Sequence, residues 1–208
     1  MMNLEHLEDF LARENQRFIC YAAASADAPA EKFQVQIEHV VGASLTGDDQ
    51  QALARQAGAA QQLDAFYHEF PSLRLYCDTN SSSSAFYLAR PRKWEQLKQE
   101  LMSWIRMLHD EATHGALPDW LDNAVVFGEI PEASNYLLMP TAGSDAGKVF
   151  LFEHQTQAFT EQAGDFLTYL VKITSPTPAL LEEIRKHTQY SDGSTATKWL
   201  VEHFSFDK

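Results

Sequence analysis

The chain has 208 residues, of which 29 are acidic (Asp and Glu) and 16 are basic (Lys and Arg), so its formal net charge is −13 at pH 7. This length suits one domain with a core of ordinary size, and the 45% hydrophobic and 12% aromatic content excludes a wholly disordered chain. The negative charge disfavours direct nucleic-acid binding, which needs Lys and Arg to displace counterions. It favours a basic protein as any macromolecular partner.

The N-terminus and the cysteines indicate a compartment. The first ten residues include Glu5, Glu8 and Asp9 and lack the basic and apolar regions of a secretory signal. No uninterrupted apolar run approaches the ~18 residues of a membrane span. Cys20 and Cys77 are too few for a disulfide framework, so both are expected to be buried free thiols. We therefore expect a cytoplasmic protein that does not contact membranes.

The first part of the chain changes between helical and extended patterns. Apolar residues recur at intervals of three and four near the start, which predicts an amphipathic helix over residues 3–24 that contains Cys20. Residues 33–41 alternate apolar and polar side chains, as a half-buried strand does. A second helix is predicted over 48–70, and it ends before Pro71.

The middle of the chain predicts two strands and a long helix. Residues 73–78 and 85–89 have the pattern of strands, with a serine-rich loop between them. Pro91 begins a helix in which Trp94, Leu97, Leu101 and Leu108 recur at helical spacing.

The most regular part of the chain follows. Three strands are predicted over 124–130, 135–139 and 148–153, and the glycine-rich loop 141–147 between the last two has the residues that a hairpin needs for positive φ angles. Strands joined by so short a loop pair antiparallel.

Helices are predicted around 160–173, over 180–187 and in a last segment that contains Trp199, Leu200 and Phe204. Helices on both sides of a mostly antiparallel sheet define an α+β fold.

Several kinds of catalytic or cofactor site are not indicated. The segment from Gly143 to Lys148 has three residues between its glycines, Val149 after the lysine and a strand beyond it, whereas a phosphate-binding loop needs four residues, a Ser or Thr and a helix. His109 and His114 are five residues apart, which places them on different faces of a helix and disfavours zinc binding. We therefore expect no metal and no cofactor.

Acidic residues are frequent in the regular segment. One interpretation is a solvated rim, since pairs of acids must occur by chance among 29 of them. The other is a negative docking patch, because complementary fields accelerate encounter with a basic protein and exclude wrong partners. Among the four tryptophans, Trp120 is the one most expected to reach the surface. The predicted partner-binding set is Asp119, Asp122, Glu129, Glu132, Asp145 and Glu153.

A family resemblance comes from the order of short motifs in this segment. Val125-Val126-Phe127-Gly128-Glu129 is followed by Asn135-Tyr136-Leu137-Leu138, then by the strand Gly147–His154 and a helix with Phe166, Leu167 and Leu170. This succession resembles the SUKH superfamily (Smi/Knr-like proteins), best known for immunity proteins of bacterial toxin systems. Residues 63–70 are similar to the helix that leads into the family's sheet.

The resemblance implies a non-catalytic protein that binds and neutralises a cognate toxin, commonly a nuclease or a deaminase, through one face of the sheet. It implies a division of one α+β domain, residues 1–208, into a helix–strand–helix elaboration (1–60), a SUKH-like core (61–173) and C-terminal helices (174–208).

Two other functions stay open at this point. The same fold could serve an intracellular scaffold or regulatory adaptor, which shares every feature above. An unrecognised hydrolase or transferase would use His154 with Glu153 or Glu129 as acid–base groups, and it requires these side chains to converge in a concave pocket with shifted pKa values.

Overall fold

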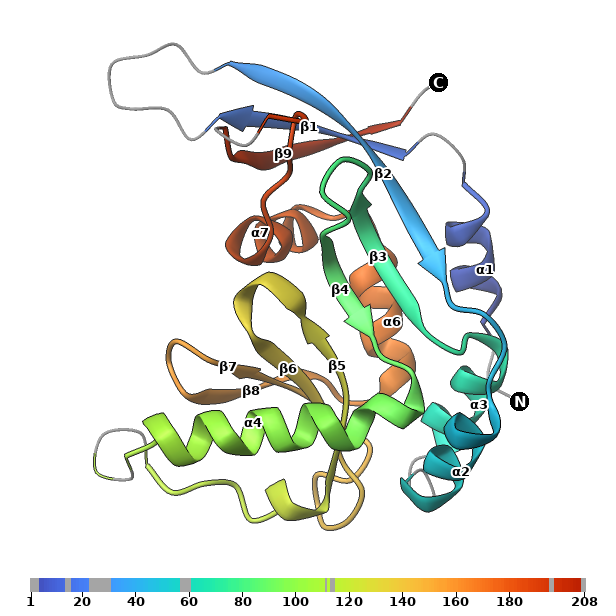
Figure 1. Cartoon of the computed structure of the whole chain (residues 1–208), viewed down its shortest axis with the longest axis vertical. Coiled ribbons are helices and arrows are strands. Elements are labelled where there is room, and N and C mark those ends of the chain that lie inside the picture. The colour runs from blue at the N-terminus through green and yellow to red at the C-terminus, as the bar shows by residue number, and fades with distance from the viewer. Residues whose placement is uncertain are drawn as a thin grey trace.

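The described strands form one antiparallel sheet, with helices against both of its faces (Figure 1). This computed structural model describes residues 4–13, 16–22, 31–56, 61–110, 112, 115–194 and 197–206. The strand order is β8-β7-β6-β5-β4-β3-β2-β1-β9, so strands β1 to β8 follow one another across the sheet and β9 returns to pair with β1. The predicted α+β fold is confirmed.

The strands span the following residues: β1 Gln16–Ala22, β2 Lys32–Val41, β3 Leu73–Asp78, β4 Ser84–Leu88, β5 Ala124–Ile130, β6 Asn135–Pro140, β7 Val149–Glu153, β8 Ala158–Ala163 and β9 Trp199–Phe206. The α-helices are α1 Glu5–Leu11, α2 Gly47–Gln56, α3 Gln61–Glu69, α4 Trp94–Leu108, α6 Phe166–Thr174 and α7 Pro178–His187. Short 3-10 turns are η1 Pro91–Lys93, η2 Leu121–Asn123 and η3 Pro131–Ala133.

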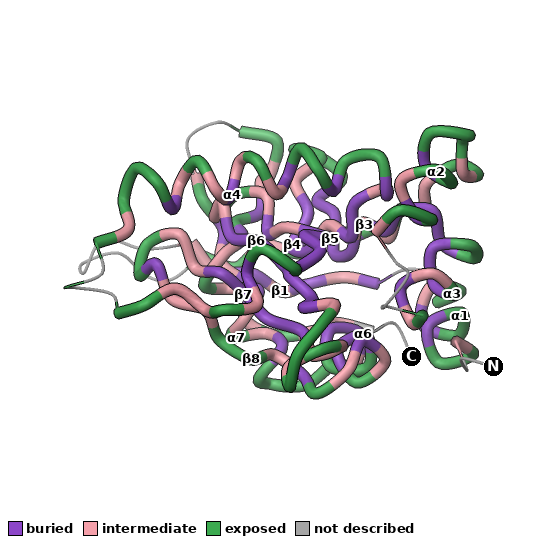
Figure 2. Tube along the Cα trace, turned by 90° about the horizontal axis from the view of Figure 1, so that it is seen from below, coloured by how far each residue is buried: buried purple, intermediate pink, exposed green. Residues whose placement is uncertain are grey.

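The sheet is the middle of three layers. Figure 2 shows α4 along one face and α6 and α7 on the opposite face, with the buried residues between them. Aromatic side chains pack in the core between the sheet and the helices. The ring centroids of Phe127 and Phe166 lie 5.4 Å apart, and those of Tyr67 and Trp94 lie 5.0 Å apart. Tyr67 also donates a hydrogen bond to the carbonyl oxygen of Phe127 at 3.0 Å, so its buried hydroxyl is satisfied.

The junction between β4 and β5 depends on a glycine. These strands pair through Tyr87 with Glu129 and Leu88 with Gly128, and the register of β5 against β6 shifts at the same place. A Cβ atom at Gly128 would lie 2.5 Å from the carbonyl oxygen of Tyr87. Glycine therefore permits the two backbones to approach at this point.

The predicted helix over residues 3–24 is wrong in its second half. The helix α1 ends at Leu11, and β1 follows with Phe18 and Cys20 buried. The segment 16–22 is rich in aromatic and β-branched side chains that alternate in burial, and its edges pair with β2 and β9. The segment therefore forms a strand through its pairing with β2 and β9, although the spacing of its apolar residues also fits a helix. Residues 14–15 and 23–24 of the predicted helix lie outside the described residues.

The two C-terminal predictions also need correction. The last predicted helix is the strand β9, in which Trp199 and Val201 are buried and which pairs with β1. The first residues of the helix predicted around 160–173 belong to β8, and the observed helix α6 begins only at Phe166. Asp165 caps α6, because its carboxylate accepts a hydrogen bond from the backbone N–H of Thr168 at 2.8 Å. In its described residues, the segment 174–208 therefore contains the strand β9 as well as the helix α7, and not only helices.

Most of the remaining predictions hold with small shifts of boundary, and one predicted helix is divided. The predicted helix over 48–70 is two helices, α2 and α3, and residues 57–60 between them lie outside the described residues. Both cysteines are free and buried, as expected. The confirmed elements are the strands β2, β3, β4, β5, β6 and β7 and the helices α4 and α7.

A half-buried histidine connects the N-terminal strands. His39 on β2 accepts a hydrogen bond from the backbone N–H of Tyr76 through Nδ1, and its Nε2 lies 3.1 Å from Oε1 of Gln16. Because Nδ1 accepts, Nε2 carries the proton and the ring is neutral. Burial lowers the pKa of His39 to about 4. Tyr76 has a φ angle of 56°, at the irregularity where β2 and β3 change register.

Candidate partner-binding site

Five of the six predicted acids lie at one or the other end of the strands β5, β6 and β7. Asp119, Asp122 and Asp145 lie where β5 begins and β6 ends. Glu132 and Glu153 lie at the opposite end, beyond Ile130 and at the end of β7. The six residues of β6 separate these ends by about 17 Å at a rise of ~3.4 Å per residue. Glu129 lies between them on β5.

We call the first group the acidic end, defined by Asp119, Asp122 and Asp145. Asp119 and Asp145 line a hollow of about 510 Å³, and Asp122 is exposed on the adjacent turn η2. No basic residue is found among the described residues that line this hollow. Its lining consists of Pro118, Asp119, Trp120, Asn123, Ala142, Gly143, Ser144 and Asp145.

Two backbone turns hold the acidic end in place. In the first, the N–H of Leu121 donates to the carbonyl oxygen of Pro118 at 3.0 Å, which forms the turn that presents Asp119. In the second, Gly143 and Gly147 have φ angles of 85° and 84°, as predicted for the hairpin loop. The N–H and the hydroxyl of Thr141 both donate to the carbonyl oxygen of Asn123, at 2.9 and 2.6 Å, and join the two turns.

Trp120 forms one wall of the hollow and is half-buried. Its ring packs on Phe150, with centroids 4.6 Å apart, and meets Phe159 edge-on at 5.5 Å. The ring is therefore fixed by the strands β7 and β8, while part of it stays accessible. A fixed, partly exposed tryptophan beside two carboxylates suits a Lys or Arg side chain from a partner, since the ring face and the carboxylates both attract a cation.

Two lysines of the chain already take part in this charge distribution. Lys98 on α4 donates hydrogen bonds to the carbonyl oxygens of Asp122 and Ala124, at 2.6 and 3.1 Å. Lys148 lies 2.8 Å from Oδ1 of Asp145 and 3.1 Å from Oε2 of Glu161. These two carboxylates raise the pKa of Lys148, so it stays protonated. The group of Asp145, Lys148 and Glu161 thus keeps one net negative charge. Asp119 and Asp122 add two more, and Lys98 offsets one of them, so the acidic end keeps two net negative charges.

Glu129 lies in a different environment. It is half-buried on β5, paired across the sheet with Tyr87 on one side and Tyr136 on the other. Burial, and next the negative charge of Glu100 on α4, raise the pKa of Glu129. This carboxyl is therefore less available to an outside partner than the aspartates of the acidic end.

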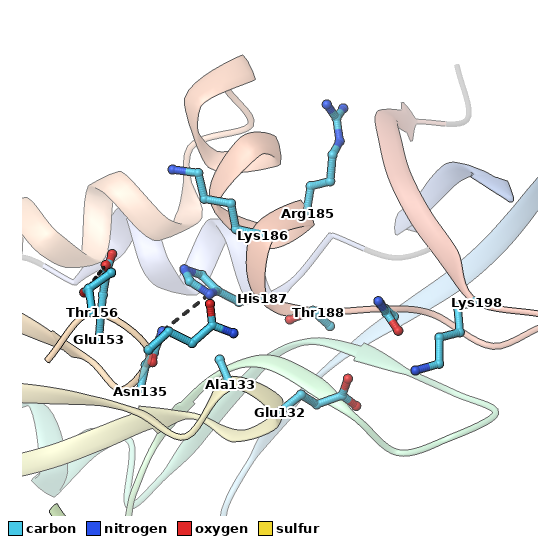
Figure 3. Close-up of a pocket in the computed structure, with 12 residues that line it drawn as sticks. Glu132, Ala133, Asn135, Glu153, Thr156, Arg185, Lys186, His187, Thr188 and Lys198 are labelled. Atoms are coloured by element: carbon cyan, nitrogen blue, oxygen red, sulfur yellow. Dashed lines mark hydrogen bonds between the residues drawn. The ribbon is translucent and has the colours of Figure 1, made fainter. Parts of the chain in front are cut away.

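Glu132 and Glu153 line a second depression, the α7 cleft, of about 620 Å³ (Figure 3). Both are already engaged: Ser83 donates a hydrogen bond to Glu132, and the hydroxyl of Thr156 donates to Glu153 at 3.0 Å. Burial raises the pKa of Glu132. The cleft is lined by Glu132, Ala133, Asn135, Glu153, Gln155, Thr156, Arg185, Lys186, His187, Thr188, Gln189 and Lys198.

The three candidate acid–base groups do not share one depression. Glu153 lines the α7 cleft, whereas His154 and Glu129 are not part of its lining. The ring of His154 packs against Trp104, with centroids 4.4 Å apart, and its backbone N–H donates to Oδ1 of Asn135 at 2.8 Å. This arrangement holds the turn after β7 against α4 and β6.

The basic residues of the α7 cleft were missed by sequence reasoning. Arg185, Lys186 and His187 occupy the last turn of α7, where cations are common because they offset the helix dipole. Lys198 precedes a segment that was predicted as a helix and is the strand β9. The cluster of basic residues at the end of the predicted helix 180–187 was the signal in the sequence that could have indicated this cleft.

Comparisons with known proteins give no relative for this chain: no family model, no curated protein and no solved structure matches it. Within the described ranges, no three His, Cys, Asp or Glu residues are grouped to hold a metal ion. A search of the same residues finds no helix with the length and apolar character needed to cross a membrane.

Proposed function

We propose that this chain is a non-catalytic binding protein of the cytoplasm that neutralises a cognate bacterial toxin by presenting its acidic end to a basic surface. The observation that carries the proposal is the grouping of Asp119 and Asp145 around the fixed ring of Trp120. The net charge of −13 supports it, since a negative field accelerates encounter with a basic partner.

The SUKH-like succession of motifs supports the toxin as the class of partner. The motifs of that resemblance fall on the strands β5, β6 and β7 and the helix α6, which form the part of the fold that carries the acidic end. A nuclease or a deaminase that acts on nucleic acid has a cleft lined with Lys and Arg, and carboxylates can occupy the positions that phosphates take there. The partner we propose is therefore a basic toxin of this kind.

The test is co-expression of the chain with the product of the neighbouring gene. We expect a complex that survives purification and relieves the toxicity of that product. In the double variant D119K/D145K we expect binding to weaken by about 5- to 1,000-fold, because charge reversal at a contact costs roughly 1–4 kcal/mol.

The matched control is Glu8→Lys, which makes the same change of charge per site on the exposed face of α1. It should leave the affinity within about twofold. A neighbouring product that is neither toxic nor bound would overturn the toxin proposal, and binding to a non-toxic partner would instead favour the adaptor.

A further inference from the structure

A lysine of α4 holds the turn that carries part of the acidic end. The Nζ atom of Lys98 donates to the carbonyl oxygens of Asp122 and Ala124, at 2.6 and 3.1 Å. Lys98 is half-buried, and α4 crosses the sheet beside the start of β5 (Figure 1). Hydrogen bonds from an ammonium group are about twice as strong as those between neutral groups. These two bonds therefore tie the turn η2 to α4.

The carbonyl group between these two is held from the other side. Asn123 accepts hydrogen bonds from the N–H and the hydroxyl of Thr141, and its own N–H donates to the carbonyl oxygen of Trp120 at 2.9 Å. The three consecutive carbonyl groups of residues 122–124 are thus fixed alternately by α4 and by the beginning of the hairpin loop. The turn that they form includes Asp122 and directly follows Trp120.

Lys98 also changes the charge of the acidic end. Counted with Lys148 and Glu161, the acidic end keeps two net negative charges, and without Lys98 it would keep three. A more negative field accelerates the encounter with a basic partner. A turn without its anchor has to be ordered on binding, and this ordering weakens a complex. The two consequences of losing Lys98 therefore oppose each other.

We propose that Lys98 is a positioning residue of the acidic end: it holds η2 in the conformation that a basic partner binds. It acts through Asp122 and Trp120 and not by contact with the partner. This inference rests on the proposed function, which supplies the partner. It accounts for a cation in a surface that binds cations, because the bonds of Lys98 to the backbone fix the turn although its charge weakens the field.

The first test uses the chain without a partner. Hydrogen exchange of the backbone N–H groups of Leu121 and Asn123, followed by NMR, reports whether the turn stays closed. In Lys98→Met we expect exchange at these groups at least about tenfold faster, as for the loss of charge-assisted hydrogen bonds, and unchanged exchange at Leu138 in β6. Lys98→Arg keeps the donors and should exchange like the wild type. Unchanged exchange of the turn in Lys98→Met would overturn the proposal.

The second test measures the rates at which the purified product of the neighbouring gene binds and leaves the chain. In Lys98→Met we expect association about twofold faster at low salt and dissociation about tenfold faster, and Lys98→Arg should restore both rates. The matched control Arg106→Met removes an exposed positive charge elsewhere on α4 and should leave dissociation unchanged. A role in charge alone predicts slower dissociation in Lys98→Met. Dissociation that is unchanged or slower in this variant would overturn the proposal.

The two tests separate the role of Lys98 from the proposed function. If the wild-type chain binds no basic partner, the proposed function is overturned, and the exchange rates alone decide whether Lys98 positions the turn. Tight binding by the wild-type chain, together with wild-type rates in Lys98→Met, would overturn the role of Lys98 and leave the proposed function standing.

Discussion

The contact between β4 and β5 makes Gly128 the most informative position for testing the fold. In Gly128→Ala the new Cβ would lie 2.5 Å from the carbonyl oxygen of Tyr87 and 3.2 Å from Cδ1 of Leu137. The carbonyl belongs to the backbone of β4, so the clash is relieved only by moving that strand. Overpacking of this kind costs roughly 1–3 kcal/mol, and we expect a value near the upper end.

An effect on the unfolded state offsets part of this loss of stability. Replacing glycine by alanine restricts the unfolded chain, which stabilises the fold by roughly 0.4–1 kcal/mol. The net loss should therefore be about 2 kcal/mol, or about 4–8 °C in Tm for a domain of this size. Urea denaturation followed by circular dichroism measures the free energy of unfolding directly.

The control for this variant is Gly47→Ala at the start of α2. Nothing lies within 4 Å of a Cβ built at Gly47, so the substitution should leave the stability unchanged or raise it by up to ~1 kcal/mol. If Gly128→Ala were as stable as Gly47→Ala, the close approach of β4 and β5 would be wrong.

Three further predictions concern ionisable groups that are buried or half-buried. Asp49 is fully buried, and its carboxylate lies 2.6 Å from Nη2 of Arg90. Asp49→Asn should therefore lower the free energy of unfolding by about 3 kcal/mol at neutral pH. This value is at the lower end for breaking a buried pair, because Arg90 still donates hydrogen bonds to the carbonyl oxygens of Ala43 and Ser44. The hydrogen bonds from Arg90 and Thr46 outweigh burial and hold the pKa of Asp49 below 3.8, so this contribution is present above pH 3.8 and is lost as the pH falls further; an acid transition unchanged in Asp49→Asn would refute the assignment. Burial lowers the pKa of His39 from 6.5 to about 4, so between these pH values the unfolded state binds more protons than the folded state. The free energy of unfolding should therefore decrease as the pH falls from 6.5 to 4, and it should decrease less steeply in His39→Gln. Equal slopes for the two proteins would contradict this assignment. Burial raises the pKa of Cys20 to about 12 and that of Cys77 to about 11, so neither thiol should react with a thiol reagent at pH 8 until urea unfolds the chain, and rapid labelling of the native protein would show that they are accessible.

The central strands could be predicted because local pattern and tertiary environment agree there. The segment Ala124–Ile130 is apolar almost throughout, and β5 is buried on both faces between α4 and α6. Gly143 and Gly147 lie in a loop whose positive φ angles their residue type allows.

The strands β1 and β9 could not be predicted in the same way. Their apolar residues fit both a helical spacing and an alternation of period two, as in the segment from Trp199 to Phe206. Each pairs with the other, although more than 170 residues separate them along the chain. Long-range pairing of this kind leaves no trace in a local window.

The candidate site shows the same limit. The grouping of Asp119 with Asp145 follows from the hydrogen bonds between Thr141 and Asn123. These bonds join the hairpin loop, which the sequence predicted, to the turn at residues 118–121, which it did not. The separation of Glu132 and Glu153 from these aspartates follows from the direction of the strands between them. Because the acids are close in sequence, they were predicted to form one surface. In the structure the length of β6 separates them into two groups.

The association rate of the purified basic partner with this chain, measured by stopped-flow at increasing salt, tests the central proposal most directly. The proposal predicts a rate that falls steeply as salt screens the acidic end, and a slower, nearly salt-independent rate for D119K/D122K/D145K. A rate that is the same for both proteins at every salt concentration would contradict it.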